Sequence, residues 1–208
     1  VSDPVEQVRH LLAEKDLVVT ENNASAIREA DVVVLAVKPQ VMADVLKPLV
    51  NIVQQKKPLI ISIAAGINVD SLSRWLGGDL SIVRAMPNTP ALVQTGATGL
   101  YASPLVSFEQ RQQTETVLGA VGLTLWVDDE ALIDSVTAVS GSGPAYFFYV
   151  MEAMISAGKA LGLDEKTARA LTLQTALGAA QMAITSDEPP AELRKRVDRK
   201  STRLNSSH

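Results

Sequence analysis

Three short apolar runs of this sequence each end in residues suited to hold a flat ligand against the backbone. Val32–Ala36 is followed by Val37, Lys38 and Pro39; Leu59–Ser62 by Ile63, Ala64, Ala65 and Gly66; and Ile82–Ala85 by Met86, Pro87, Asn88, Thr89 and Pro90. Small and ring-containing residues let a ligand approach backbone amides and carbonyls closely. One such turn is an ordinary helix start, where proline is common, but three in succession indicate a cofactor-binding crevice.

A second group of candidate residues precedes a long apolar segment, in the turn Ser140–Pro144. Proline commonly opens a helix, and the free N–H groups and partial positive charge of a helix N-terminus favour an anion such as a carboxylate. Helix capping by Ser142 or Gly143 is the simpler interpretation and is compatible with a ligand role. Glu130, in "DDEALID", has the position of a solvated acid at a helix start, and its spacing alone gives weak support for a ligand role.

Other chemistries find no support in the sequence. The absence of cysteine excludes a disulfide framework and thiolate chemistry, and it fits a reducing compartment, so a cytoplasmic location is predicted. His10 and His208 have no metal-ligand spacing, so no metal site is predicted, and hydrolase motifs are missing. The net charge of -4 argues against a nucleic-acid partner. Glu152 and Lys159 interrupt the most apolar segment, which argues against a membrane span.

The candidate turns require a scaffold, and the first 127 residues alternate between strand and helix patterns. Further β-branched runs predict strands at Leu17–Thr20, Thr98–Tyr101 and Leu123–Val127. Apolar residues recur at helical spacing between several runs, and Ser107 with Gln110 forms a capping-box pattern. This alternation predicts a Rossmann-like parallel sheet covered by helices on both faces. In such folds ligands bind at the carboxyl ends of the strands, where the candidate turns lie.

Beyond Asp128 the strand patterns stop, and helices are predicted at Asp129–Val139, Pro144–Leu161 and Asp164–Thr185. The second of these is apolar around most of its circumference, so other elements must bury it. The remaining chain offers few helices to do so. We therefore predict an all-α dimerisation domain, with packing against the first domain as the alternative.

Several segments together resemble one enzyme family: "SDP", "AVKPQ", "ISIAAGI", "VRAMPNTPALV", "TAVSGSGPAYFF" and "ALGLDEKTARALTLQTALGAA". From Val1 to about Val197 the chain resembles pyrroline-5-carboxylate reductases. The resemblance implies reduction of 1-pyrroline-5-carboxylate to L-proline with NADPH or NADH, the last step of proline biosynthesis. It also implies a partial dinucleotide-binding domain, 1–128, and a partial helical domain, 129–197, similar to the C-terminal domain of 6-phosphogluconate dehydrogenase. That domain would form a homodimer or a larger ring of dimers.

The resemblance implies roles for individual residues. Those expected beside the cofactor are Ser2, Asn23, Ala36, Val37, Lys38, Pro39, Ala64, Ala65 and Gly66. Those expected beside the substrate are Asn88, Ser140, Gly141, Ser142, Gly143 and Pro144. Glu130 matches an acid near the ring nitrogen and is the candidate catalytic side chain, a helper that favours a protonated imine. Ser2 beside Asp3 leaves the choice between NAD and NADP open.

The family pattern is incomplete at both ends. The glycine-rich phosphate loop G-x-G-x-x-G is absent, as is the "SPGGTT"-like segment expected after "LRKRV". Asp198–His208 matches the translation of a widely used sequencing-library adapter codon for codon, so we interpret it as an artefact and exclude it from the fold. We expect this chain alone to be inactive and to bind the cofactor weakly.

Two alternative functions stay open at this point. One is a non-catalytic, nucleotide-binding dimer module. The other is a related β-hydroxyacid dehydrogenase, which would need a catalytic lysine early in the helical domain. Lys159 lies too deep in its predicted helix to fit that requirement.

Overall fold

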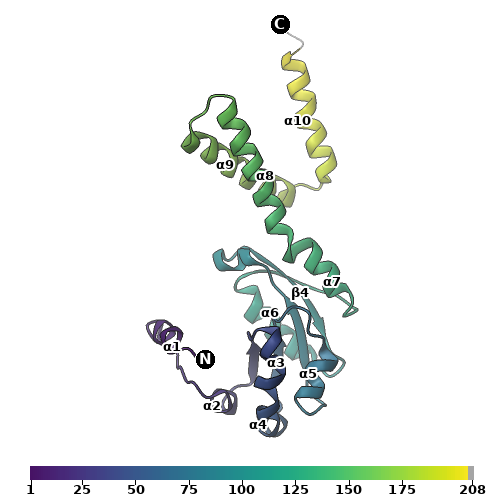
Figure 1. The fold of residues 1–208 in the computed structure, drawn as a ribbon. Coiled ribbons are helices and arrows are strands. Elements are labelled where there is room, and N and C mark those ends of the chain that lie inside the picture. Colours follow the sequence, from purple (N-terminus) through teal and green to yellow (C-terminus); the bar gives the residue numbers. More distant parts are fainter. Residues whose placement is uncertain (206–208) are drawn as a thin grey trace. The chain divides into compact units, whose positions relative to one another are not determined.

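The computed structural model describes the backbone of residues 1–205 and the side chains of residues 1–198. The chain forms two compact units, Val1–Pro144 and the residues from Ala145 onward. The first unit contains the sheet, and the second is helical (Figure 1). The domain boundary expected at residue 128 lies within the first unit, which extends to Pro144 and includes α7 (Leu132–Val136), a helix in contact with β3 and β4. That boundary stays a prediction.

The first unit is built on one five-stranded sheet, which confirms the predicted Rossmann-like α/β class. Its strands are β1 (Val32–Leu35), β2 (Leu59–Ser62), β3 (Ile82–Met86), β4 (Gly96–Ala102) and β5 (Gly122–Trp126), in the order β1-β2-β3-β4-β5. Its helices are α1 (Glu6–Ala13), α2 (Asn23–Arg28), α3 (Pro39–Leu46), α4 (Val50–Lys56), α5 (Val69–Trp75), α6 (Phe108–Gly119) and α7 (Leu132–Val136). Short 3₁₀ turns, η1 (Lys47–Leu49) and η2 (Thr89–Val93), join some of them.

The sheet is parallel except between β3 and β4, which pair antiparallel. The predicted parallel sheet is therefore confirmed, with the pairing of β3 and β4 as its one antiparallel exception among the described strands. Only residues 87–95 connect the two strands, and a parallel pair needs a crossover of about a dozen residues or more. The strand expected at Leu17–Thr20 is reduced to an isolated parallel bridge between Thr20 and Ser2.

Side chains of the central strands are buried on both faces, as their continuous apolar character predicted. Ile60 and Ile82 point to a core shared with Met42, Leu46 and Leu72 of α3 and α5. On the other face, Leu59, Ile61 and Val83 meet Leu100 and Leu118, the latter from α6. Each large side chain buried in this way contributes roughly 1.5–3 kcal/mol to stability. The two cores fix the strands whose ends carry the candidate turns.

Helix α6 begins with the predicted capping box. The Gln110 N–H donates to Oγ of Ser107 at 3.2 Å, and the Ser107 N–H donates to Oε1 of Gln110 at 3.0 Å. The Ser107 hydroxyl also donates to the Glu109 carboxylate, which lowers the pKa of Glu109. The box satisfies N–H groups that a helix start leaves without intrahelical partners.

Helix α7 packs very closely on β4 and continues into a π-helical turn, Thr137–Gly141. A Cβ atom on Gly99 of β4 would lie 2.6 Å from Cγ1 of Val136 in α7, so only glycine fits there. The π turn is closed by the Ser142 N–H, which donates to the Thr137 carbonyl at 2.8 Å. The single helix expected at Asp129–Val139 is thus a short α-helix followed by a π turn. Such π-helical turns are often found at functional sites.

The second unit contains α8 (Gly143–Ala160), α9 (Glu165–Thr185) and α10 (Pro190–Asn205), of which α8 starts just before the division between the units. Five consecutive apolar or aromatic residues of α8, Tyr146–Val150, are each more than half exposed. Helix α10 includes much of Asp198–His208, and residues 206–208 lie outside the described part. Helical geometry does not test where this segment comes from, so its interpretation as an artefact stays a prediction. Within the described chain, every helix is too short or too polar to cross a bilayer.

Candidate functional site

The carboxyl ends of β1, β2 and β3 lie side by side at one edge of the sheet. Leu35, Ser62 and Arg84 occupy neighbouring register positions near those ends. Because the three strands are parallel, the turns that follow them meet at this edge, which we call the carboxyl edge. The structure thereby brings together the segments Ala36–Pro39, Ala64–Gly66 and Pro87–Asn88.

The first two turns expose backbone at this edge. Ala36, Lys38 and Pro39 are exposed, with Lys38 in the cap position of α3 and Pro39 opening the helix. Ala64 is buried, whereas Ala65 and Gly66 are exposed. Gly66 has φ of +73°, a left-handed conformation that glycine adopts without the steric cost of a Cβ atom. The strands therefore end in turns whose backbone is accessible to a ligand.

Asn88 connects the end of β3 to the turn Ser140–Pro144. Its side-chain Nδ2 donates to the Ser140 carbonyl at 3.0 Å, and its Oδ1 accepts the Ala97 N–H at 2.8 Å. A Cβ atom on Gly141 would lie 3.0 Å from Cε of Met86, the last residue of β3. The turn thus lies against the carboxyl edge. Both ends of the Asn88 amide bind protein groups, and direct contact with a substrate stays a prediction.

Glu130 is largely buried and engaged with two partners. Its Oε1 accepts the Val69 N–H at 2.8 Å and lies 3.2 Å from Nη1 of Arg84. The side chains of Arg84 and Glu130 are 8% and 23% exposed, so the expectation of a solvated helix-start acid is wrong. A second carboxylate, on Asp134, lies 3.6 Å from Nη2 of Arg84. The predicted catalytic role of Glu130 stays a prediction, and these contacts favour a positioning role.

Sequence reasoning missed Arg84. The signal was present, because a charged residue stands in the middle of the apolar strand "IVRAM". A buried cation requires a partner, but the sequence did not indicate that the partner is 46 residues away.

Ser2 and Asn23, the residues expected at the adenosine end of the cofactor, lie in other elements. Ser2 belongs to the bridge with Thr20, and its Oγ is buried without a hydrogen-bond partner among the described residues. Asn23 opens α2 and lines an open, partly polar hollow with Glu21 and Asp44. Within the described residues, neither side chain hydrogen-bonds to the turns at the carboxyl edge. Their ligand roles stay predictions.

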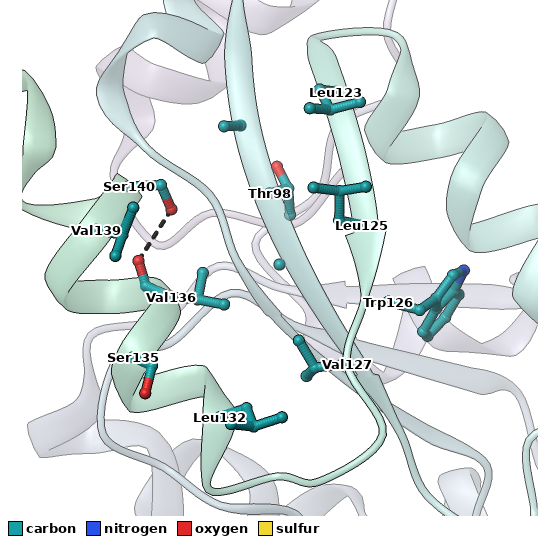
Figure 2. Close-up of a pocket in the computed structure, with 12 residues that line it drawn as sticks. Thr98, Leu123, Leu125, Trp126, Val127, Leu132, Ser135, Val136, Val139 and Ser140 are labelled. Atoms are coloured by element: carbon teal, nitrogen blue, oxygen red, sulfur yellow. Dashed lines mark hydrogen bonds between the residues drawn. The ribbon is translucent and has the colours of Figure 1, made fainter. Parts of the chain in front are cut away.

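A groove of about 500 Å³ lies between strands β4 and β5 and the α7–π-turn segment (Figure 2). It is lined by Ala97, Thr98, Gly99, Leu123, Leu125, Trp126, Val127, Leu132, Ser135, Val136, Val139 and Ser140. None of these residues is charged, and the Ser140 hydroxyl donates to the Val136 carbonyl at 3.0 Å. The groove therefore offers no charged side chain to the phosphates of a dinucleotide, and it was not predicted from the sequence.

Comparisons with known proteins decide the family. Residues 130–201 match the family model for pyrroline-5-carboxylate reductase dimerisation, and residues 1–66 match that for NADP oxidoreductase coenzyme F420-dependent. A pyrroline-5-carboxylate reductase of Pseudomonas aeruginosa is 57% identical over 197 residues, which cover 94% of this chain and 72% of the relative. The chain belongs to the pyrroline-5-carboxylate reductase family. The reductase of Haemophilus influenzae is 50% identical, over 88% of this chain and 67% of its own length.

Solved structures of family members have the same fold. The pyrroline-5-carboxylate reductase of Coxiella burnetii superposes with a TM-score of 0.92 at 40% identity, covering all of this chain and 79% of that one. The pyrroline carboxylate reductase of Plasmodium falciparum, solved with NADP bound, gives 0.79 at 31% identity, over 91% of this chain and 75% of that one. A prephenate dehydrogenase of Aquifex aeolicus, at 15% identity and a TM-score of 0.55, shares the fold alone.

Proposed function

We propose that the product of the complete gene reduces 1-pyrroline-5-carboxylate to L-proline with NADPH or NADH, the last step of proline biosynthesis. The observation that carries this proposal is the Asn88 bridge, which holds the Ser140–Pro144 turn against the carboxyl edge. A cofactor segment and a substrate segment are thereby neighbours, as hydride transfer requires. Membership of the family supports the same conclusion.

The residues at the carboxyl edge fit a nicotinamide cofactor. Exposed small residues, Ala36, Ala65 and Gly66, leave backbone groups accessible, and the buried Ser2 hydroxyl lacks a partner among the described residues. We assign Ala36–Pro39 and Ala64–Gly66 to the nicotinamide end and Ser2 with Asn23 to the adenosine end. When bound, the cofactor supplies a hydride.

The chain's contribution to the reaction is mainly positioning. A protonated cyclic imine is already an electrophile, so the site has to hold its reactive carbon in place and exclude water. The Ser140–Pro144 turn leads into the start of α8 at Gly143, and free backbone N–H groups at such a helix start are suited to the substrate carboxylate. Asn88 holds this turn in place, and Glu130 holds the start of α5 through the Val69 N–H.

We also propose that the protein is a homodimer, and that a second copy covers both the apolar face of α8 and the groove. The exposed segment Tyr146–Val150 lies within the region matched by the dimerisation model, residues 130–201. The groove residues Leu132, Val136 and Val139 lie in the same region. Exposed apolar surface of this extent is typical of protein interfaces. A cytoplasmic location is a further proposal, favoured by the absence of cysteine.

The test is turnover by the purified product of the complete gene. We expect oxidation of NADPH or NADH that depends on added 1-pyrroline-5-carboxylate, with L-proline as the product. Binding of the nucleotide without turnover would support a non-catalytic module instead. Turnover of a β-hydroxyacid in place of the imine would support the dehydrogenase alternative, although Lys159 is paired with Glu165 at 2.9 Å, near the end of α8.

A further inference from the structure

A chain of polar contacts runs from the start of α5, just after the turn Ala64–Gly66, to α7. It starts at Val69, the third residue after Gly66, whose N–H donates to Oε1 of Glu130. The same oxygen lies 3.2 Å from Nη1 of Arg84, and Nη2 of Arg84 lies 3.6 Å from Asp134 in α7. The Glu130 carboxylate therefore contacts α5 and β3, and the Arg84 guanidinium continues the chain of contacts from β3 to Asp134 of α7.

We propose that Glu130 is a positioning residue that holds the cofactor turn, Ala64–Gly66, in its binding geometry through the backbone of Val69. Arg84 in turn holds Glu130. The inference rests on the proposed function, because it takes the ligand of that turn to be the nicotinamide cofactor. It differs from the role expected from the sequence, in which Glu130 acts directly on the substrate.

The burial of Val69 and Arg84 explains why the hydrogen bond between Val69 and Glu130 is strong. Val69 is 8% exposed, and its N–H is one of the helix-start donors that lack an intrahelical acceptor. Without Glu130 this donor would be buried and unpaired. Arg84 is similarly buried in β3, next to Ser62 of β2 in the register, so its position is fixed by the sheet. A carboxylate held by a buried arginine is a rigid acceptor.

Loss of Glu130 should weaken binding of the cofactor more than binding of the substrate. Val69 is the first residue of α5 and follows Gly66 by three positions, so a displacement of its backbone is passed to the preceding turn. The Ser140–Pro144 turn is fixed by two hydrogen bonds that do not involve Glu130. The Asn88 side chain donates to the Ser140 carbonyl, and the Ser142 N–H donates to the Thr137 carbonyl. Loss of Glu130 should therefore leave the substrate turn in place.

The experiment compares Glu130→Ala with Glu130→Gln in the product of the complete gene. NADPH binding is measured by fluorescence titration without substrate, and KM for 1-pyrroline-5-carboxylate is measured at saturating NADPH. We expect Glu130→Ala to raise the Kd for NADPH about tenfold, the scale of one unpaired buried hydrogen-bonding group. Glu130→Gln keeps an acceptor for Val69, so its Kd should stay within about threefold of wild type. KM for the pyrroline should change little in either variant.

The matched control is Asp128→Asn, which removes an exposed carboxylate from the same segment and should leave both constants unchanged. An unchanged Kd for NADPH in Glu130→Ala would overturn the inference. So would a Kd increase equally large in Glu130→Gln, or a change confined to the pyrroline KM, which would indicate direct substrate contact. If Glu130→Ala does not fold, Arg84→Lys is measured in its place, because this variant loosens Glu130 without removing either charge. The Kd of Arg84→Lys for NADPH should rise above that of Glu130→Gln. If wild type neither binds NADPH nor reduces the pyrroline, the proposed function has failed instead.

Discussion

Asn88 shows how one side chain organises two parts of the candidate site. Its amide offers a donor to the Ser140 carbonyl and an acceptor to the Ala97 N–H. The two side chains closest to it in shape cannot replace it, because aspartate lacks the donor and leucine lacks both the donor and the acceptor. The residue therefore holds the Ser140–Pro144 turn against the end of β3.

We predict that Asn88→Leu raises KM for 1-pyrroline-5-carboxylate and lowers the free energy of unfolding by about 1–3 kcal/mol. The reason is that the variant leaves a donor and an acceptor without their partner. Steady-state kinetics and urea unfolding measure the two effects. Asn51→Leu, at an exposed position of α4, is the control. An unchanged KM in Asn88→Leu would show that the bridge does not position the substrate turn.

At the scale of residues, the sequence predicted the segments of the site better than their connections. The turns after β1, β2 and β3 were recognisable because each follows a continuous apolar run, and parallel pairing brings them together. The contact between Arg84 and Glu130 was not, because it joins residues 46 positions apart through the tertiary fold. The burial of Glu130 is a consequence of the same contact.

At the scale of elements, the close approach of α7 to β4 sets where the π turn and the substrate turn lie. Gly99 permits it, since a Cβ atom there would overlap Val136. We predict that Gly99→Ala lowers the free energy of unfolding by roughly 1–3 kcal/mol, as overpacking usually does. The double variant Gly99→Ala with Val136→Ala should recover part of that loss, because the shorter side chain makes room. Additive losses in urea unfolding would contradict the packing argument.

The capping box of α6 gives a second prediction at this scale. Ser107→Ala should lower the free energy of unfolding by about 0.5–2 kcal/mol, because the Gln110 N–H loses its acceptor. Gln113→Ala, at an exposed position within the same helix, should change it little. Urea unfolding of both variants is the measurement, and equal stabilities would mean that the cap contributes nothing.

Elements were predicted well where their signals are local. The capping box and the apolar strands depend on residues a few positions apart, and both appear where the sequence placed them. The direction of β4 was missed, because an apolar run carries no information on whether it pairs parallel or antiparallel. The π turn at Thr137–Gly141 was missed because its apolar spacing resembles that of an ordinary helix.

At the scale of the whole molecule, the exposed apolar face of α8 is the main feature that one chain leaves unexplained. We predict that Phe148→Asp converts the dimer of the complete gene product into monomers, because a buried, unpaired carboxylate costs several kcal/mol. Sedimentation or light scattering gives the mass. Gln112→Asp, on α6 and outside the region matched by the dimerisation model, should leave the dimer intact. A wild-type protein that is monomeric would refute the dimer proposal.

A crystal structure of the complete gene product with NADPH bound would locate the cofactor on the protein. We predict that the nicotinamide lies at the carboxyl edge, against Ala36–Pro39 and Ala64–Gly66, with the Ser140–Pro144 turn facing it. Density for the cofactor in the groove between β4 and α7, or at any place away from the ends of β1 and β2, would show that the carboxyl edge is not the cofactor site.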